Sequence, residues 1–331
     1  MINKKILITG AAGFIGFHVA KRLLEQGHMV VGVDNLNSYY PVQLKKDRLK
    51  QLEIFENFCF YCLDVADSKA MEGMWKQENS ITHVIHLAAQ AGVRYSLVDP
   101  YPYVHSNVMG FTVILEQCRY QSNFEHLVYA STSSVYGLNP TLPFKEEHSA
   151  DHPISLYAAT KRANELMAQS YYHLYRFPIT GLRLFTVYGP WGRPDMSLFK
   201  FTKAILSGET IDVYNHGRMS RDYTYISDIV DGILAALWKP ASLQNIDHPL
   251  YNLGNDQKQP LLTFIDALEQ ALGEKADKNF LPLQPGDIVE TLSDIQKAKT
   301  ELGYNPKVSI YQGIAEFVKW YQNYEGRFLG I

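Results

Sequence analysis

The sequence predicts an α/β fold built on a doubly wound parallel sheet, followed by a smaller C-terminal α/β unit. Short apolar runs alternate with longer amphipathic stretches over the first two-thirds of the chain. This is the βαβ rhythm of a parallel sheet with helices on both faces. The first apolar run leads directly into a glycine-rich turn that opens a helix. After Arg183 the rhythm loosens into loops that carry proline and glycine, as expected where a second unit begins.

Six apolar runs predict the strands of the sheet, at residues 6–9, 30–34, 58–63, 83–87, 127–131 and 179–184. Amphipathic patterns between them predict helices, among them residues 15–26, 101–120 and 156–175. Further helices are expected at residues 197–206, 226–238, 262–272 and 310–324. We therefore expect one domain over residues 1–184 and a second mainly over 185–331, with segments such as 221–240 returning to the first. A ligand is expected in the cleft where the second domain rests on the strand ends of the first.

The composition is that of a globular protein without a strong charge bias. The chain has 331 residues, of which 46% are hydrophobic and 20% charged, so it can bury a substantial core. Its formal net charge is -3 and it has no long basic stripe, which argues against nucleic acid as a partner. The apolar run at residues 6–8 is too short for a signal peptide or a membrane span, so we expect no membrane partner and a cytoplasmic location.

The three cysteines do not predict a metal site. Cys59 and Cys62 lie in the predicted strand 58–63, where residues three apart point to opposite faces, and no second cysteine pair completes a zinc set. The eleven histidines form no spaced cluster. We expect no metal, and we expect both cysteines and Cys118 to be buried or semi-buried thiols, as in a reducing compartment.

The glycine turn after the first strand predicts a phosphate-binding site. Gly10, Gly13 and Gly16 stand at a strand-to-helix junction, with Phe14 and Ile15 between the last two. Glycines there permit a tight turn and close approach of the backbone, while the helix N-terminus offers amide donors and a positive dipole to a pyrophosphate. This context favours a dinucleotide cofactor over a purely structural glycine turn.

Asp34 closes the second strand, eighteen residues after Gly16. An acidic side chain at this position accepts hydrogen bonds from the adenosine ribose hydroxyls and repels a 2′-phosphate. Asn35 and Asn37, which follow, supply no cation for such a phosphate. The sequence therefore favours NAD over NADP.

The ends of the third and fourth strands give weaker candidates for cofactor contacts. Asp64 and Val65 end the third strand, in position to touch adenine. The fourth strand ends in small residues that let the chain approach the cofactor, with the sequence Leu87, Ala88, Ala89 and Gln90. A turn or simple close packing would explain either group equally well.

Tyr157 and Lys161 are four residues apart on a predicted helix, so they share one face. A neighbouring ammonium group favours the phenolate, which makes the pair a candidate base for a substrate alcohol. An aromatic residue packed under a solvated lysine is the alternative. Hydroxyls at the end of the fifth strand are expected to face the same cleft; for any one of them, capping of a turn is the alternative. They are Ser131, Thr132, Ser133 and Ser134.

Taken in order, these motifs resemble the extended short-chain dehydrogenase/reductase family over nearly the whole chain. The resemblance implies a Rossmann domain that holds NAD as a resident redox group. It also implies a catalytic triad, which here is Thr132, Tyr157 and Lys161. Lys161 and Tyr157 would also contact the cofactor, as would Ser131, and Thr132 would share the proton of the substrate hydroxyl with Tyr157.

The residues after Thr132 distinguish branches of this family. Sugar-nucleotide 4,6-dehydratases have Asp-Glu where Ser133 and Ser134 stand, and nucleotide-glucuronate decarboxylases usually have Glu at the second position. Without those carboxylates, the resemblance implies hydride and proton exchange at a single carbon, which is epimerisation at C4. The nucleotide-sugar epimerase branch is therefore the closest match.

Two segments, 90–96 and 185–195, resemble UDP-glucuronate 4-epimerases in particular. UDP-galactose 4-epimerases typically carry Asn near Thr186 and lack arginines corresponding to Arg94 and Arg193. Hydroxyl and guanidinium groups bind a hexuronate carboxylate by charge-assisted hydrogen bonds, so we expect Thr186, Ser133, Ser134, Arg193 and Arg94 to contact substrate. For either arginine, a surface salt bridge or a loop-ordering contact is the alternative.

The resemblance also implies contacts with the nucleotide. Arg221 corresponds to the family arginine on the UDP diphosphate and Asp287 to the acid on the uridine ribose. Tyr214 is a candidate for stacking on uracil, or alternatively a core aromatic. Some galactose-type epimerases have an arginine where Gln284 stands.

The implied function is NAD-dependent C4 epimerisation of a UDP-hexuronic acid through a 4-keto intermediate, for surface polysaccharide. The main alternative is a UDP-glucose/UDP-galactose 4-epimerase; a UDP-glucuronate decarboxylase or a non-catalytic NAD-binding protein follows. The resemblance further implies a homodimer in which helices 101–120 and 156–175 form a four-helix bundle.

Overall fold

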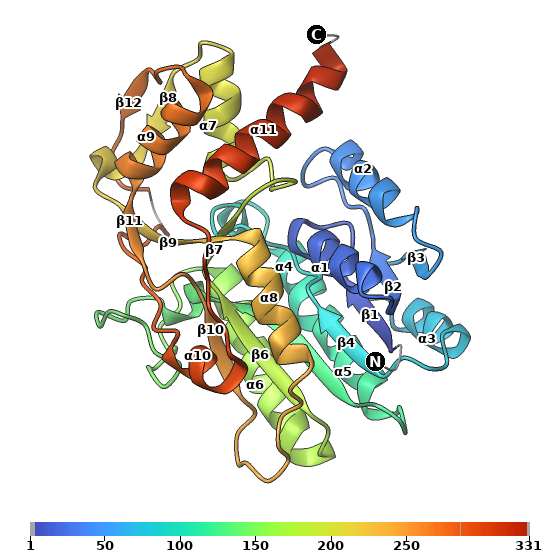
Figure 1. The fold of residues 1–331 in the computed structure, drawn as a ribbon. Helices are drawn as coiled ribbons and strands as arrows, with labels where there is room; N and C mark the ends of the chain where they lie inside the picture. The colour runs from blue at the N-terminus through green and yellow to red at the C-terminus, as the bar shows by residue number, and fades with distance from the viewer. Residues whose placement is uncertain (1–3, 285, 330–331) are drawn as a thin grey trace.

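A seven-stranded parallel sheet forms the centre of the protein, as seen in the computed structural model, which describes residues 4–284 and 286–329 (Figure 1). Its strand order is β3-β2-β1-β4-β5-β6-β10. The strands are β1 (Lys5–Thr9), β2 (Met29–Asp34), β3 (Phe58–Cys62), β4 (His83–His86), β5 (His126–Thr132), β6 (Ile179–Leu184) and β10 (Leu250–Leu253). The order reverses between β1 and β4, and ligands bind at such a switch point in doubly wound sheets. The predicted fold class is confirmed.

Helices cover both faces of this sheet because its strands are apolar on both sides. Ile6 and Ile8 of β1 face one core, while Leu7 between them faces the other. The first core is closed by α1 (Phe14–Glu25), α2 (Val42–Leu52), α8 (Ile226–Leu237) and α10 (Gln296–Leu302). The second is closed by α3 (Ser68–Gln77), α5 (Gly110–Arg119) and α6 (Leu156–Tyr175).

A smaller unit, at the upper left of Figure 1, has a third core of its own. One three-stranded sheet in it has the order β11 (Lys258–Pro260), β9 (Ser220–Tyr225), β7 (Thr186–Tyr188). A second pairs β8 (Ile211–Val213) with β12 (Lys278–Phe280). Its helices are α7 (Ser197–Leu206), α9 (Leu261–Leu272) and α11 (Ile310–Leu329).

The helix predicted at residues 101–120 is not a single regular helix. It consists of α4 (Tyr101–Tyr103), a π-helical segment η2 (Val104–Met109) and α5. Within η2 the buried Asn107 accepts from Gln90 N at 2.8 Å and donates to Gln90 O at 3.1 Å and to Thr160 Oγ1 at 3.0 Å. The wider turn thus carries a side chain that ties the end of β4 to α6, and π-helical turns are frequent at functional sites.

The prediction that all three cysteines are buried or semi-buried is wrong for two of them. Cys59 and Cys62 are exposed, because β3 is the edge strand of the sheet and is incompletely covered by helices. Cys118 is buried, on the inner side of α5.

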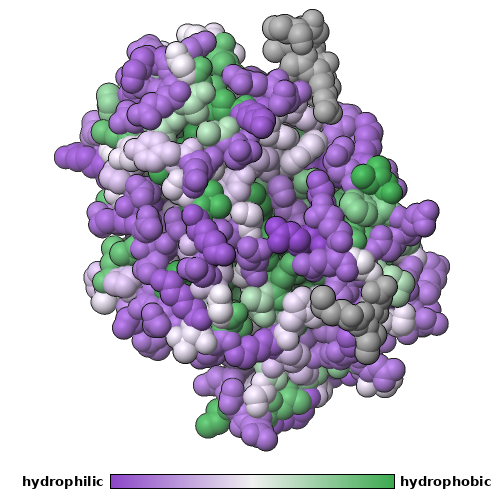
Figure 2. Space-filling model, viewed as in Figure 1, coloured by the Kyte–Doolittle hydropathy of each residue, from purple (hydrophilic) through white to green (hydrophobic). Residues whose placement is uncertain are grey.

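Within residues 4–284 and 286–329, no helix is long and apolar enough to cross a membrane. The same residues contain no group of three or more His, Cys, Asp or Glu side chains that could hold a metal ion. Figure 2 shows hydrophilic side chains over most of one face, with hydrophobic residues in small separate patches.

Candidate active site

A cavity of about 1020 Å³ lies at the carboxyl ends of the central strands, against the smaller unit. It is lined by every site residue predicted from the sequence except Asp64. The carboxylate of Asp64 instead accepts from Ala66 N at 2.8 Å, Asn35 Nδ2 at 3.2 Å and His105 Nε2 at 3.2 Å. Asp64 therefore orders the chain next to the cavity, whereas its neighbour Val65 faces it.

The glycine turn has the geometry of a phosphate cradle. Gly10 has a φ of +74°, and a Cβ there would lie 2.8 Å from Ala88 N. A Cβ on Gly16 would lie 2.0 Å from Gly10 O, so only glycine fits at these two positions. Gly13 begins α1 without a side-chain cap, which leaves the first amides of the helix to a ligand. These features fit the pyrophosphate of a dinucleotide.

Asp34 lines the cavity at the end of β2, and a lysine from another element lies close to it. Lys45 Nζ, from α2, lies 3.9 Å from Asp34 Oδ1 and donates to Asn37 Oδ1 at 2.9 Å. Burial lowers the pKa of Lys45, and the charge of Asp34 opposes that effect. The cation is already paired with the acid, so Asp34 still suits a ribose with free hydroxyls. Nothing in the sequence pattern showed that α2 would turn this lysine inward.

Tyr157 and Lys161 both reach the cavity from the first turns of α6. The helix begins there because Ser155 caps it, with Oγ accepting from Ala158 N at 3.1 Å. Burial raises the pKa of Tyr157, while hydrogen bonding with Thr132 and the charge of Arg193 oppose the rise. Burial also lowers the pKa of Lys161 to about 8. Desolvation thus outweighs the effects that lower the phenol pKa, and the charge among them is that of Arg193, not that of the expected Lys161.

The hydroxyls that end β5 form a connected group on the same wall. Thr132 Oγ1 accepts from Ser134 N at 3.2 Å and lies 3.3 Å from Ser134 Oγ. Ser131 points away from this group and donates to the buried Glu165 Oε1 at 2.6 Å. Thr132 therefore caps the short helix that follows and also faces the cavity.

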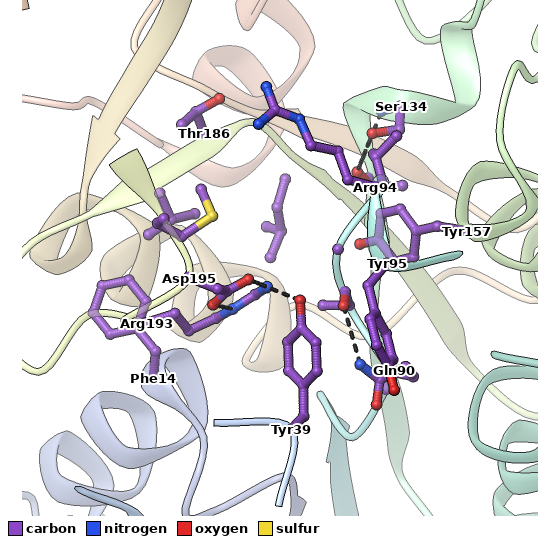
Figure 3. Close-up of a pocket in the computed structure, with 18 of the residues that line it drawn as sticks. Phe14, Tyr39, Gln90, Arg94, Tyr95, Ser134, Tyr157, Thr186, Arg193 and Asp195 are labelled. Atoms are coloured by element: carbon purple, nitrogen blue, oxygen red, sulfur yellow. Dashed lines mark hydrogen bonds and ion pairs between the residues drawn. The ribbon is translucent and has the colours of Figure 1, made fainter. Parts of the chain in front are cut away.

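Across the cavity from Tyr157 and Ser134 lie Thr186, Arg193 and Asp195 (Figure 3). Arg193 forms a bidentate ion pair with Asp195, with Nε 3.0 Å from Oδ1 and Nη2 2.5 Å from Oδ2. Tyr39 Oη donates to the same carboxylate at 3.1 Å. Arg193 thus lines the cavity with its charge already paired. Tyr39 and Asp195 were missed in the sequence because both lie in loops, which have no periodic pattern.

Arg94 and Asp287, predicted to contact different parts of a substrate, pair with each other at 2.7 Å. The guanidinium of Arg94 also lies over the ring of Tyr214, 4.7 Å from its centroid. Three residues that were predicted to contact the substrate thus form one cluster, which joins the larger and the smaller unit. Arg94 thus lies beside the residue assigned to the uridine ribose, and its contact with the sugar carboxylate stays a prediction.

Arg221, in the smaller unit, lines the cavity and donates hydrogen bonds to backbone carbonyls. Its Nη1 donates to Ser220 O at 3.1 Å and Val289 O at 2.9 Å, and it forms no ion pair with a described residue. Burial lowers its pKa. Lys200 also lines the cavity and was missed in the sequence, where it is one of two lysines on α7. An anionic ligand would satisfy both cations.

A family model described as "NAD dependent epimerase/dehydratase family" matches residues 6–254. The chain belongs to this family. A probable UDP-glucuronate 4-epimerase of Rhizobium meliloti is 46% identical over 97% of this chain and 98% of its own length. UDP-glucuronate 4-epimerase 4 of Arabidopsis thaliana is 45% identical over 96% of this chain and 75% of its own.

Solved structures of epimerases match the same extent of the chain. UDP-glucuronic acid 4-epimerase from Bacillus cereus, in complex with UDP-glucuronic acid and NAD, is 36% identical with a TM-score of 0.85 and covers 97% of this chain and 99% of its own. UDP-glucose 4-epimerase from Thermotoga maritima, with UDP-glucose, is 31% identical with a TM-score of 0.87 and the same coverage. The epimerase family likeness thus extends over both units and the cavity between them.

Proposed function

We propose that the protein is a UDP-glucuronate 4-epimerase that interconverts UDP-glucuronate and UDP-galacturonate and holds NAD as its redox cofactor. The observation that carries this proposal is one cavity that contains Thr132, Tyr157 and Lys161 together with hydroxyls, not carboxylates, at Ser133 and Ser134. Relatives with this name are 43–46% identical to nearly the whole chain.

The residues present fit NAD, as the glycine turn and Asp34 indicate. Its pyrophosphate would bind at the N-terminus of α1, its adenosine ribose at Asp34, and its nicotinamide ribose at Lys161. When bound, NAD would supply the redox chemistry, which is removal of hydride from sugar C4 and its return to the opposite face. The remaining contacts with NAD would be made by Val65 and by the small residues that end β4.

Tyr157 Oη takes the proton of the C4 hydroxyl, with Thr132 as the hydrogen-bonded partner that shares it. Because burial raises the pKa of Tyr157, the phenolate depends on positive charge around it, which Arg193 supplies and to which we propose that Lys161 adds. A 4-keto sugar results, turns over within the cavity, and receives the proton back on its C4 oxygen from Tyr157.

The 4-keto intermediate of a hexuronate is a β-keto acid, so the site must also prevent its decarboxylation. If its C5–C6 bond stands perpendicular to the ketone, the bond breaks, CO2 leaves, and the electron pair forms an enolate that is then protonated at C5. A site that holds the carboxylate away from this alignment prevents the loss. Ser133, Ser134, Thr186 and Arg193 hold it in our proposal.

The nucleotide is proposed to bind the smaller unit, with its diphosphate at Arg221, its ribose at Asp287 and uracil on Tyr214. This gives an NAD-binding domain over residues 1–184 and a UDP-sugar domain mainly over 185–331. We further propose a cytoplasmic homodimer, supported by exposed apolar side chains on the helices that would form its interface, which include Val104, Met109, Leu166 and Leu174.

Incubation of the purified protein with UDP-glucuronate, without added reductant, tests the proposal. The expected product is UDP-galacturonate, identified by NMR through the changed configuration at C4. UDP-glucose is the matched substrate with a neutral sugar and should turn over at least about tenfold more slowly, because its C6 hydroxymethyl group makes no charge-assisted bond to the site. Comparable turnover of UDP-glucose would overturn the choice of substrate, and CO2 as the main product would indicate a decarboxylase.

A further inference from the structure

The loop of residues 189–195, called the substrate loop below, carries Arg193 and has an irregular backbone. Gly189 has a φ of +143°, and Trp191 has a φ of +62°, in the left-handed region that non-glycine residues rarely adopt. Such conformations persist only where surrounding contacts hold them. The contacts that hold the loop therefore determine where Arg193 points.

Three successive carbonyls of the substrate loop accept hydrogen bonds from helices α1 and α2. His18 Nε2 lies 2.9 Å from Pro190 O. Burial lowers the pKa of His18 to about 4, so its ring is neutral at pH 7 and donates through Nε2. Arg48 Nη2 donates to Trp191 O at 2.6 Å and to Gly192 O at 3.3 Å. The larger unit thus holds the loop at its strained residue.

The second terminal nitrogen of the same guanidinium reaches the glycine turn of residues 10–16, called the cofactor turn below. Arg48 Nη1 donates to Ala12 O at 2.8 Å and to Tyr40 Oη at 2.8 Å. Ala12 lies inside the glycine turn, between Gly10 and Gly13. One side chain therefore bonds two backbone segments about 180 residues apart in sequence, and each segment lines the cavity nearby.

The burial of Arg48 shows that this link is costly to maintain. The side chain has an exposed fraction of 0% and makes no ion pair with any residue in the described part of the chain. A buried cation without a carboxylate is unfavourable unless several acceptors solvate it. A lysine has its donors on a single nitrogen and cannot span both segments, whereas the planar fork of arginine can.

We infer that Arg48 is a positioning residue that joins the cofactor turn to the substrate loop and so keeps Arg193 aligned on the carboxylate of the substrate. The inference rests on the proposed function. It implies that loss of the link leaves Tyr157 and its partners intact but lets the uronate carboxylate move. The C5–C6 bond of the 4-keto intermediate then reaches the breaking alignment more often.

The test compares Arg48→Lys and Arg48→Gln with the wild type on UDP-glucuronate. The readout is the fraction of turnovers that ends in CO2 rather than UDP-galacturonate, measured with labelled C6. Both variants should raise this fraction at least about tenfold, since small misplacements at a reacting centre have effects of about this size or more. Tyr172→Phe is the matched control, because it removes another buried side-chain bond to a backbone carbonyl, that of Ser242, away from the cavity.

Each outcome of this test has a defined meaning. A wild-type fraction in Arg48→Lys would show that charge alone suffices and would overturn the inference, as would an unchanged fraction in both variants. A wild type that does not epimerise UDP-glucuronate would overturn the proposed function instead. If the Arg48 variants do not fold, His18→Leu removes the neighbouring anchor at Pro190 without a buried charge, and it should raise the CO2 fraction in the same direction.

Discussion

At the scale of single residues, Tyr157 and Lys161 lie in surroundings that disfavour the charged form of each. Burial raises the pKa of the phenol and lowers that of the ammonium to about 8. A phenolate and an ammonium group that face one cavity stabilise each other, so the pair is far better suited to proton transfer than either residue alone. Thr132 adds a hydrogen bond that favours the phenolate.

Tyr157→Phe should lower kcat for UDP-glucuronate by about 10²–10⁴-fold, the usual contribution of a general base. NMR measurement of UDP-galacturonate formation checks this. Substrate binding should change little, because the ring and its packing against Tyr103 remain. Tyr304→Phe, which removes a buried hydroxyl bonded to Gly254 O at 2.8 Å, is the control and should keep the wild-type rate. Wild-type turnover by Tyr157→Phe would exclude it as the base.

The pH dependence of kcat/KM should fall on the alkaline side near pH 8. Lys161 loses its positive charge as the pH rises through its lowered pKa of about 8, and the phenolate loses its counter-charge. The carboxylate of Glu165 raises the pKa of Lys161, so Glu165→Gln should move this fall to lower pH. A pH profile in which the alkaline limb stays fixed in Glu165→Gln would mean that another group sets it.

At the scale of elements, hydrophobic periodicity correctly predicted the strands and helices whose positions depend on local apolar patterns. The six strands lie within two residues of their predicted bounds, and α6 and α7 have the predicted ones, because each carries a continuous apolar face. The π-helical turn of η2 was not predictable, since its sequence has the same apolar spacing as a regular helix. Pairings between distant loops, such as Tyr39 with Asp195, depend on tertiary structure and leave no periodic trace.

Asn107→Ala should destabilise the fold, because η2 depends on that side chain. The change leaves Gln90 N and Gln90 O without their buried partner, at a cost of about 1–3 kcal/mol for each unsatisfied group. Urea unfolding, monitored by circular dichroism, measures the loss. Asn139→Ala, at an exposed turn, is a control that should change little. Unchanged stability of Asn107→Ala would show that η2 is held by other contacts.

At the scale of the whole molecule, the two units meet through charged side chains that also line the cavity. The pair of Arg94 and Asp287 joins them at one side, and Arg48 joins α2 to the substrate loop at another. The geometry of the cavity therefore depends on how the units are held together, and a partner subunit that stiffens the larger unit would stabilise the site as well.

The proposed homodimer predicts a solution mass of about twice 37.7 kDa. Leu166 and Leu174 are 57% and 62% exposed on α6, and a monomer would leave both in contact with water. The double variant Leu166→Glu, Leu174→Glu should therefore elute as a monomer in size-exclusion chromatography with light scattering, because charges at a buried interface are costly. Ile54→Glu changes a side chain that is 75% exposed just after α2 and should remain dimeric. A wild type that elutes at the monomer mass would refute the dimer, since α6 would then have to retain its exposed leucines without a partner.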